Sequence, residues 1–415
     1  MEVASSSAPT VSFRPLFSLP VIVASLGYFV DVYDLLLFNI VRVPSLKALG
    51  LSDADVSLIG GKIYNYQQAG LLLGGILWGI LGDKRGRMSV LFGSIITYSL
   101  ANIACGFVDD PNTYAILRFV AGLGLAGELG AGITLVSETL PKHLRGYGTS
   151  LVAGVGLMGA VVAFLTVQQF DWRVAYFIGG GMGMALLLLR VGVLESGVFT
   201  SLKQTSVRRG NFFDLFTNRS RLVRYLRCIG VGIPTYFVIG ILATFGNEFG
   251  AALGIADVQV GRGILFVYIG VATGDLVSGP LSHFLKSRLK AIGLMLTLTL
   301  VFVLIYLFGG IQDADTFYLV CGGMGFAIGY IALFLTVTAE QFGTNLRATA
   351  TTSVANNVRA TTLLTLPVFQ ALKPAMGVLG AGALVGALCF IIGFWSLATM
   401  PETFEQELDF TEDTI

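Results

Sequence analysis

Two aspartates, Asp31 and Asp34, lie inside the first long apolar stretch of this 415-residue chain. Their spacing of three residues puts both on one face of a helix. A later apolar stretch carries an opposite charge, Arg118, and Glu128 follows it ten residues further on. Charged groups inside a membrane helix are costly and are therefore functional by default. These groups suit reversible protonation, because an acid that leaves its arginine partner can take up a proton. A permanent structural ion pair is the alternative.

A second cation lies deep in another apolar stretch. Arg359 follows Arg347 by twelve residues, which places it about 18 Å further along a helix. Asn356 precedes Arg359 by three residues and shares its helical face. The planar guanidinium fork suits a carboxylate or a phosphate. Asp275 lies at a comparable depth in its own stretch and could be the resting partner of Arg359, and a structural pair without ligand contact is the alternative.

Further polar and aromatic side chains interrupt the apolar stretches. Tyr64 and Gln67 do so in the second stretch, and Tyr236 does so in the seventh. Their pattern is typical of an amphipathic cavity lining, and packing between helices would produce the same spacing. We therefore add these three residues to Arg359, Asn356 and Asp275 as candidates for substrate binding.

The elements that position these groups are membrane helices. The chain is 54% hydrophobic and 12% charged, whereas soluble domains carry about 25% charged residues. Apolar runs long enough to cross a bilayer recur along the chain, and in lipid they must be helices. The net charge of +1 gives no reason to expect a nucleic-acid partner. The sequence predicts twelve spans at 17–41, 56–81, 88–107, 111–136, 147–168, 173–194, 223–246, 260–284, 289–309, 316–338, 347–371 and 376–400.

The distribution of cations predicts the orientation. Sixteen lysines and arginines lie in the even-numbered connections and six lie in the odd-numbered ones. The positive-inside rule therefore predicts that the even connections and both termini are cytoplasmic, in the plasma membrane or the bacterial inner membrane. The polar stretch 195–222 divides the chain into two bundles of six helices, 1–194 and 223–415. A Glu–Arg spacing of seven residues recurs in both, as Glu138 with Arg145 and Glu340 with Arg347.

A charged, glycine-rich turn joins the second and third stretches. It reads Gly79-Ile-Leu-Gly-Asp83-Lys-Arg-Gly-Arg87. This turn resembles the signature loop of the major facilitator superfamily, with Lys84 where the family usually has its first arginine and Met88 where it usually has a final basic residue. The resemblance covers nearly the whole chain and implies an all-α fold of two pseudo-symmetric bundles. It also implies a cytoplasmic gate that links the two halves and includes Gly79, Asp83, Arg87, Glu138, Arg145, Glu340 and Arg347.

The resemblance extends to metabolite symporters and sugar porters. Asp171-Trp-Arg173, Glu195-Ser196 and Pro401-Glu-Thr403 are similar to motifs of those branches. We expect a monomeric secondary transporter that works by alternating access and is driven by a proton gradient, with no cofactor and no enzymatic activity. Arg359 favours a small organic anion as substrate and the acids of the first half favour proton symport. A neutral sugar or polyol symporter and a drug or metabolite efflux antiporter are the alternatives.

Overall fold

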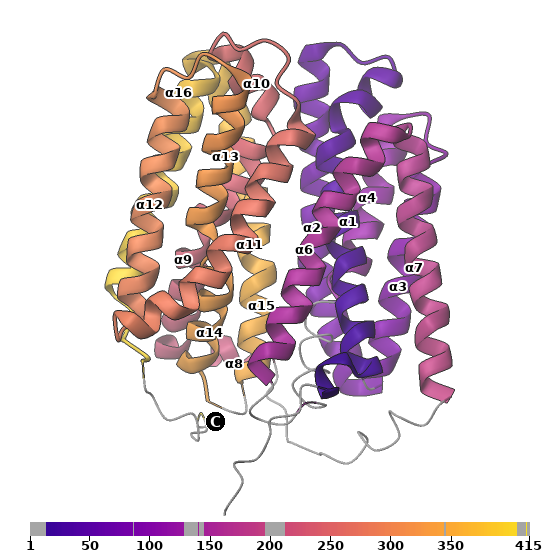
Figure 1. Cartoon of the computed structure of the whole chain (residues 1–415), viewed down its shortest axis with the longest axis vertical. Coiled ribbons are helices and arrows are strands. Elements are labelled where there is room, and N and C mark those ends of the chain that lie inside the picture. The colour runs from indigo at the N-terminus through magenta and orange to yellow at the C-terminus, as the bar shows by residue number, and fades with distance from the viewer. Residues whose placement is uncertain are drawn as a thin grey trace, which may run out of the picture.

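The computed structural model describes residues 14–85, 87–127, 140, 145–195, 212–343, 346–404 and 412. These residues form helices joined by short connections and contain no strand. The helices gather into two groups that stand side by side along their length (Figure 1). We call α1–α7 the first half and α8–α16 the second half. The all-α fold that the sequence predicts is confirmed.

The first half begins with a short 3-10 turn, η1, at Arg14–Phe17. Its described helices are α1 (Leu19–Ala48), α2 (Asp53–Arg85), α3 (Arg87–Cys105), α4 (Pro111–Leu125), α6 (Arg145–Gln169) and α7 (Trp172–Glu195). Helix α1 packs along α6 and α7, whereas α4 packs along α2 and α3. The α2–α4 contact is close enough that a Cβ on Gly122 would collide with the carbonyl oxygen of Gln67. Small residues at such crossings let membrane helices approach one another.

The second half repeats this plan. It contains α8 (Asp214–Thr217), α9 (Arg219–Phe237), η4 (Val238–Ala243), α10 (Gly246–Ala252), α11 (Val260–Phe284), α12 (Arg288–Phe308), α13 (Ala314–Ile328), α14 (Ile331–Gln341), α15 (Arg347–Ala360) and α16 (Thr362–Ala398). Helix α13 lies along α11 as α4 lies along α2, and α9 lies along α16 and α15. A π-helical segment, η4, continues α9 directly.

The helix starts reflect the same repeat. Asp110 caps α4 by accepting hydrogen bonds from the backbone N–H groups of Asn112 and Thr113. Asp313 caps α13 in the same way, through the N–H group of Thr316. Hydrogen bonds from Thr113 hold the pKa of Asp110 below its ordinary value. Such caps satisfy backbone donors that have no partner within the helix.

Several helices of the second half are broken. The helical path from α13 to α14 is interrupted at Gly329 and Tyr330, and the path from α15 to α16 is interrupted at Thr361. Within α16, Gly377 has a φ of 71°, and this non-helical residue separates two helical segments. Broken helices expose backbone donors and acceptors, which membrane proteins tolerate where protein or a cavity surrounds them.

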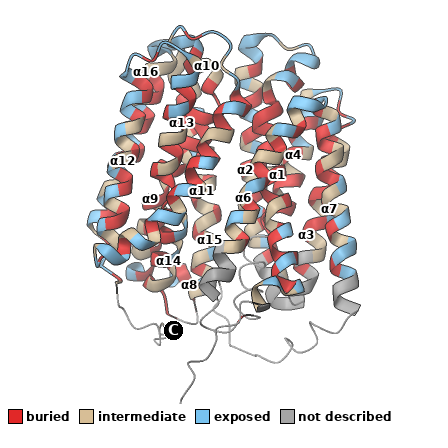
Figure 2. Cartoon of the chain, in the orientation of Figure 1, coloured by how far each residue is buried: buried red, intermediate tan, exposed pale blue. Residues whose placement is uncertain are grey.

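The outer surface of the bundle is apolar. Large aliphatic side chains are strongly exposed on its flanks, including Leu188 at 72%, Leu276 at 70% and Leu364 at 74%. Buried residues run through the middle of each half in Figure 2. By length and composition, eight helices of the described part of the chain could cross a membrane. A soluble protein would not leave such side chains in water over its whole flank, so lipid is the matching solvent.

The predicted spans agree with the helices in position. The described part of each of the twelve ranges falls mainly on helical residues, and the kink at Gly377 lies one residue after the predicted start of the last span. Helix α9 starts at Arg219, four residues before the predicted 223. Of the predicted linker 195–222, residues 196–211 lie outside the described part of the chain, as does the stretch 128–139 that ends the predicted fourth span.

Candidate functional site

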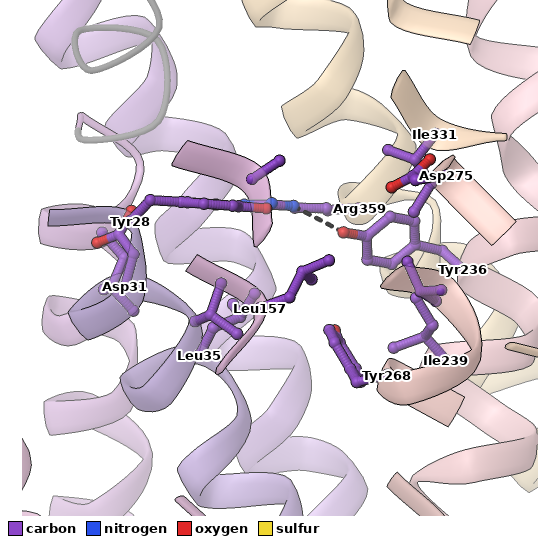
Figure 3. A pocket seen from close by; sticks show the side chains of 14 residues that line it. Tyr28, Asp31, Leu35, Leu157, Tyr236, Ile239, Tyr268, Asp275, Ile331 and Arg359 are labelled. Carbon is purple, nitrogen blue, oxygen red and sulfur yellow. Dashed lines mark hydrogen bonds between the residues drawn. The ribbon is translucent and has the colours of Figure 1, made fainter. Parts of the chain in front are cut away.

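A cavity of about 70 Å³ lies between the two halves (Figure 3). The first half contributes α1, α4 and α6 to its wall, and the second half contributes α9, η4, α11, α14 and α15. This volume has room for a few water molecules. Its polar lining residues are Tyr28, Asp31, Tyr236, Tyr268, Asp275 and Arg359.

Arg359 is the cation of this cavity. Its Nε donates a hydrogen bond of 2.7 Å to the hydroxyl oxygen of Tyr236. Tyr28 and Tyr268 line the same cavity, so three tyrosines share it with the guanidinium. No carboxylate oxygen of the described residues lies within 4.0 Å of a guanidinium nitrogen of Arg359, so Arg359 forms no ion pair with them. A guanidinium in a cavity wall needs compensation for its charge, and among the described residues its side chain bonds to a phenol and forms no ion pair.

Asp275 is not the resting partner of Arg359, contrary to the expectation from depth. Its Oδ1 accepts a hydrogen bond of 3.1 Å from the backbone N–H group of Ala332, at the start of α14. The break at Gly329 explains this contact, because it leaves helix N–H groups in the apolar interior that need an acceptor. Gly329 also packs directly on Gly274, which brings Asp275 to the break.

The other predicted substrate residues divide into two groups. Tyr236 lines the cavity, as described above. Asn356, Tyr64 and Gln67 are buried behind the lining. Asn356 packs against Gly75 of α2, where a Cβ would lie 3.0 Å from its Nδ2. The hydroxyl of Tyr64 packs near Gly240 of η4, and Gln67 Nε2 donates to the backbone oxygen of Leu35.

Two cavity tyrosines, Tyr28 and Tyr268, escaped the sequence reasoning. Tyr28 precedes Asp31 by three residues, and Tyr268 precedes Asp275 by seven, so each shares a helical face with an acid that lines the cavity. This i, i+3 and i, i+7 spacing was the signal that could have identified them. In Figure 3, Tyr28 and Asp31 approach from the α1 side, opposite Tyr236 and Asp275.

Asp31 and Asp34 occupy different environments. Asp31 lines the cavity, whereas Asp34 is fully buried behind it. The carboxyl group of Asp34 lies against Gly179 of α7, where a Cβ would collide with its Oδ1. Neither carboxyl oxygen of Asp34 accepts a hydrogen bond from the described residues. The two acids share a face of α1, as their spacing predicts, and the 60° offset between them is enough to place Asp31 in the cavity wall and Asp34 behind it.

Arg118 lies beside Asp34 without forming an ion pair with it. Its Nη1 donates to Asn102 Oδ1 at 2.7 Å, and its Nη2 donates to the backbone oxygen of Asp34 at 3.1 Å. Its guanidinium carbon lies 5.5 Å from the ring centre of Tyr176. The predicted contact between the Asp34 carboxylate and Arg118 is thus replaced by a contact to the main chain. Glu128, the further candidate acid, lies outside the described residues.

The structure describes part of the predicted gate. Glu340 accepts hydrogen bonds from Arg288 Nη2 at 3.3 Å and from the Thr403 hydroxyl at 2.6 Å, both in the second half. Arg347 donates to the backbone oxygens of Ala339 and Phe342, which end α14. Glu138 and the side chains of Asp83, Arg87 and Arg145, together with the surroundings of Gly79, lie outside the described part of the chain.

The fold and the cavity between the halves define a membrane transporter. The family model of the Major Facilitator Superfamily matches residues 24–360, and the chain belongs to this superfamily. It is therefore a multi-pass membrane transporter rather than an enzyme.

Similar proteins carry transporter names. A gentisate transporter of Corynebacterium glutamicum is 26% identical over 352 residues, covering 77% of this chain and 73% of the relative. A cis,cis-muconate transport protein of Acinetobacter baylyi is 26% identical over 387 residues, covering 89% and 91%. The crystal structure of a D-xylose-proton symporter superposes with a TM-score of 0.67 at 15% identity, covering 92% of this chain and 98% of the symporter, which shows a shared fold.

Proposed function

We propose that this protein imports a small organic anion of the carboxylate type together with a proton, by alternating access. The observation that carries the proposal is the state of Arg359. It is a cation in a cavity between two halves, it contacts a phenol, and no acid of the described residues pairs with it. A carboxylate would supply the missing charge and accept two parallel hydrogen bonds from the guanidinium.

The relatives support this substrate class. Gentisate and cis,cis-muconate, which name two similar transporters, are both carboxylates. The cavity adds aromatic surface from Tyr28, Tyr236 and Tyr268 beside the cation. A planar acid could stack on such rings while its carboxylate meets Arg359. The overall binding mode would thus join an electrostatic anchor to apolar contact.

The acids of the first half support the proposal of proton coupling. Asp31 lies in the cavity and Asp34 lies buried within the same helix. A buried carboxyl group that accepts no hydrogen bond is costly to keep charged, so Asp34 suits a site that gains and loses a proton. We further propose that the protein is a monomer in the plasma membrane, or the inner membrane of a bacterium, with both termini in the cytoplasm. The cation bias of the connections supports this orientation.

Uptake by proteoliposomes tests the proposal. Purified protein is reconstituted, a pH gradient that is acidic outside is imposed, and accumulation of labelled gentisate and labelled D-xylose is measured. We expect gentisate to accumulate, an uncoupler to abolish the accumulation, and D-xylose not to enter. Accumulation of D-xylose but not of gentisate would refute the anion proposal, and gentisate accumulation that ignores the uncoupler would refute proton coupling.

A further inference from the structure

A second charged cluster joins the two halves near α10, away from the cavity. It consists of Arg42 from α1, Ser57 from α2, Glu248 from α10, and Gln370 and Lys373 from α16. We call it the α10-end cluster. Arg42 lies seven residues beyond Leu35 of the cavity wall, and Lys373 lies fourteen residues beyond Arg359. At about 1.5 Å per residue, the cluster lies roughly 10–20 Å from the cavity along the helices.

Arg42 makes the first connection between the halves. Its Nη2 donates to the backbone oxygen of Thr244 at 3.0 Å and to Asn247 Oδ1 at 3.1 Å. Its Nη1 lies 3.6 Å from Glu248 Oε1, and the ring of Phe245 lies 4.2 Å below the guanidinium carbon. Each of these groups belongs to the second half. Gly60 of α2 leaves room for the stem of Arg42, since a Cβ there would lie 2.8 Å from its Cδ.

Lys373 makes the second connection, in the opposite direction. Its ammonium group contacts Glu248 Oε2 within its own half and donates to the hydroxyl of Ser57 in the first half at 2.6 Å. Gln370, one turn earlier, reaches the backbone oxygen of Ser57. The carboxylate of Glu248 therefore lies between two cations, one from each half.

Burial distinguishes this cluster from ordinary surface ion pairs. The side chain of Arg42 is 0% exposed, and those of Glu248 and Lys373 are 15% and 16% exposed. By contrast, the Arg262–Asp315 pair has exposures of 47% and 82% and lies within the second half. Exposed pairs contribute little to stability, whereas removal of one partner from a buried network leaves an uncompensated charge.

We propose that Arg42, Glu248 and Lys373 form a latch that holds the halves together at the α10 end and closes the cavity on that side. An alternating-access transporter must open this side in part of its cycle. Opening separates Arg42 from Thr244, Asn247 and Glu248, and Lys373 from Ser57. The latch therefore stabilises one state only, and it sets the ratio of the two states. This inference rests on the transporter fold and holds for any substrate or coupling ion.

Distance measurements between two spin labels test the latch. Ala48→Cys in α1 and Ala252→Cys in α10 place labels at exposed positions on either side of the α10 end. The four native cysteines are buried, which favours selective labelling. Pulsed electron paramagnetic resonance then gives the fractions of long and short distances in reconstituted protein. Glu248→Gln should raise the ratio of open to closed molecules about tenfold, because it removes the negative charge that faces both cations.

Matched variants separate the latch from a general loss of charge. Asp315→Asn removes an ion pair at an exposed site within one half and should leave the distances unchanged. Lys373→Met should raise the open fraction about threefold or more. The double variant with Glu248→Gln should have an open fraction close to that of Glu248→Gln alone, because the two residues act on one contact. If Glu248→Gln does not yield folded protein, the open fraction of Lys373→Met tests the latch in its place. An open-to-closed ratio within twofold of wild type, or an equal shift in Asp315→Asn, would overturn the latch.

Discussion

Arg42 and Arg359 are two arginines at the interface between the halves, the first buried and the second partly exposed to the cavity, and their partners differ. Arg42 is met by a carboxylate, a carbonyl, an amide and an aromatic ring, all from the opposite half. Arg359 is met by a phenol and opens onto a cavity. A buried charge must be compensated from somewhere. At Arg42 the compensation comes from the protein and closes the interface, whereas at Arg359 we propose that it comes from the substrate.

Loss of the cavity cation should have the largest effect. We expect Arg359→Ala to lower the rate of gentisate uptake at sub-saturating concentration by about a hundredfold, since a charged, two-pronged contact is worth about 2–3 kcal/mol. Surface expression is measured in parallel. The control is Arg262→Ala, which removes an exposed arginine of the same half. Equal uptake by the two variants would show that Arg359 does not contact the anion.

An acid introduced beside Arg359 should compensate its charge from within the protein, as Glu248 does for Arg42. Tyr236→Glu places a carboxylate where the phenol now accepts a hydrogen bond from Arg359 Nε. We expect gentisate uptake to fall more than about tenfold, because the substrate must then compete with a tethered anion. Tyr236→Phe removes a single hydrogen bond and should cost only about fivefold or less. If the two variants are equally impaired, steric disturbance rather than charge compensation explains the loss.

The two acids of α1 should separate accumulation from exchange. For one proton per substrate, a gradient of one pH unit drives at most about tenfold accumulation. We expect Asp34→Asn, or Asp31→Asn if Asp31 is the coupling acid, to reduce accumulation to equilibration. Exchange of labelled for unlabelled gentisate should survive, because exchange does not require the empty carrier to reorient. Normal accumulation by both variants would move the proton site elsewhere, with Glu128 next in line.

The smallest effect should come from a substitution in α7 at Gly179, which packs against the Asp34 carboxyl group. A Cβ at Gly179 would collide with the Asp34 carboxyl group, whereas a Cβ at Gly181 would meet nothing within 4 Å. We expect Gly179→Ala to displace Asp34, to shift the pH dependence of uptake and to lower accumulation about threefold, by analogy with other overpacked sites. Gly181→Ala, two residues further along α7, should behave as wild type. Identical pH profiles for the two variants would mean that the Asp34 pocket plays no part in coupling.

The sequence predicted the helices well for a physical reason. Uninterrupted apolar runs in lipid have helix as their main solution, so their positions follow from composition alone. The same argument placed Arg359 deep in the bundle by residue counting, and the structure puts it in the cavity wall.

The details of the site could not be predicted in this way. Whether Asp31 or Asp34 faces the cavity depends on how α1 is rotated against α6 and α7. Close contacts at Gly156, Gly159 and Gly179 set that rotation, and their effect appears only when the helices are packed together. The role of Asp275 depended on the helix break at Gly329, because a free helix start attracts an acceptor. Residue spacing within a single helix carries neither kind of information.

The central claim is that Arg359 is compensated by an anionic ligand rather than by the protein. Equilibrium binding to purified protein tests it most directly, with gentisate and its neutral analogue, 2,5-dihydroxybenzyl alcohol, on wild type and Arg359→Gln. We expect wild type to prefer gentisate over the alcohol by about a hundredfold, and Arg359→Gln to lose that preference while binding the alcohol as wild type does. A preference for gentisate that survives in Arg359→Gln would contradict the claim.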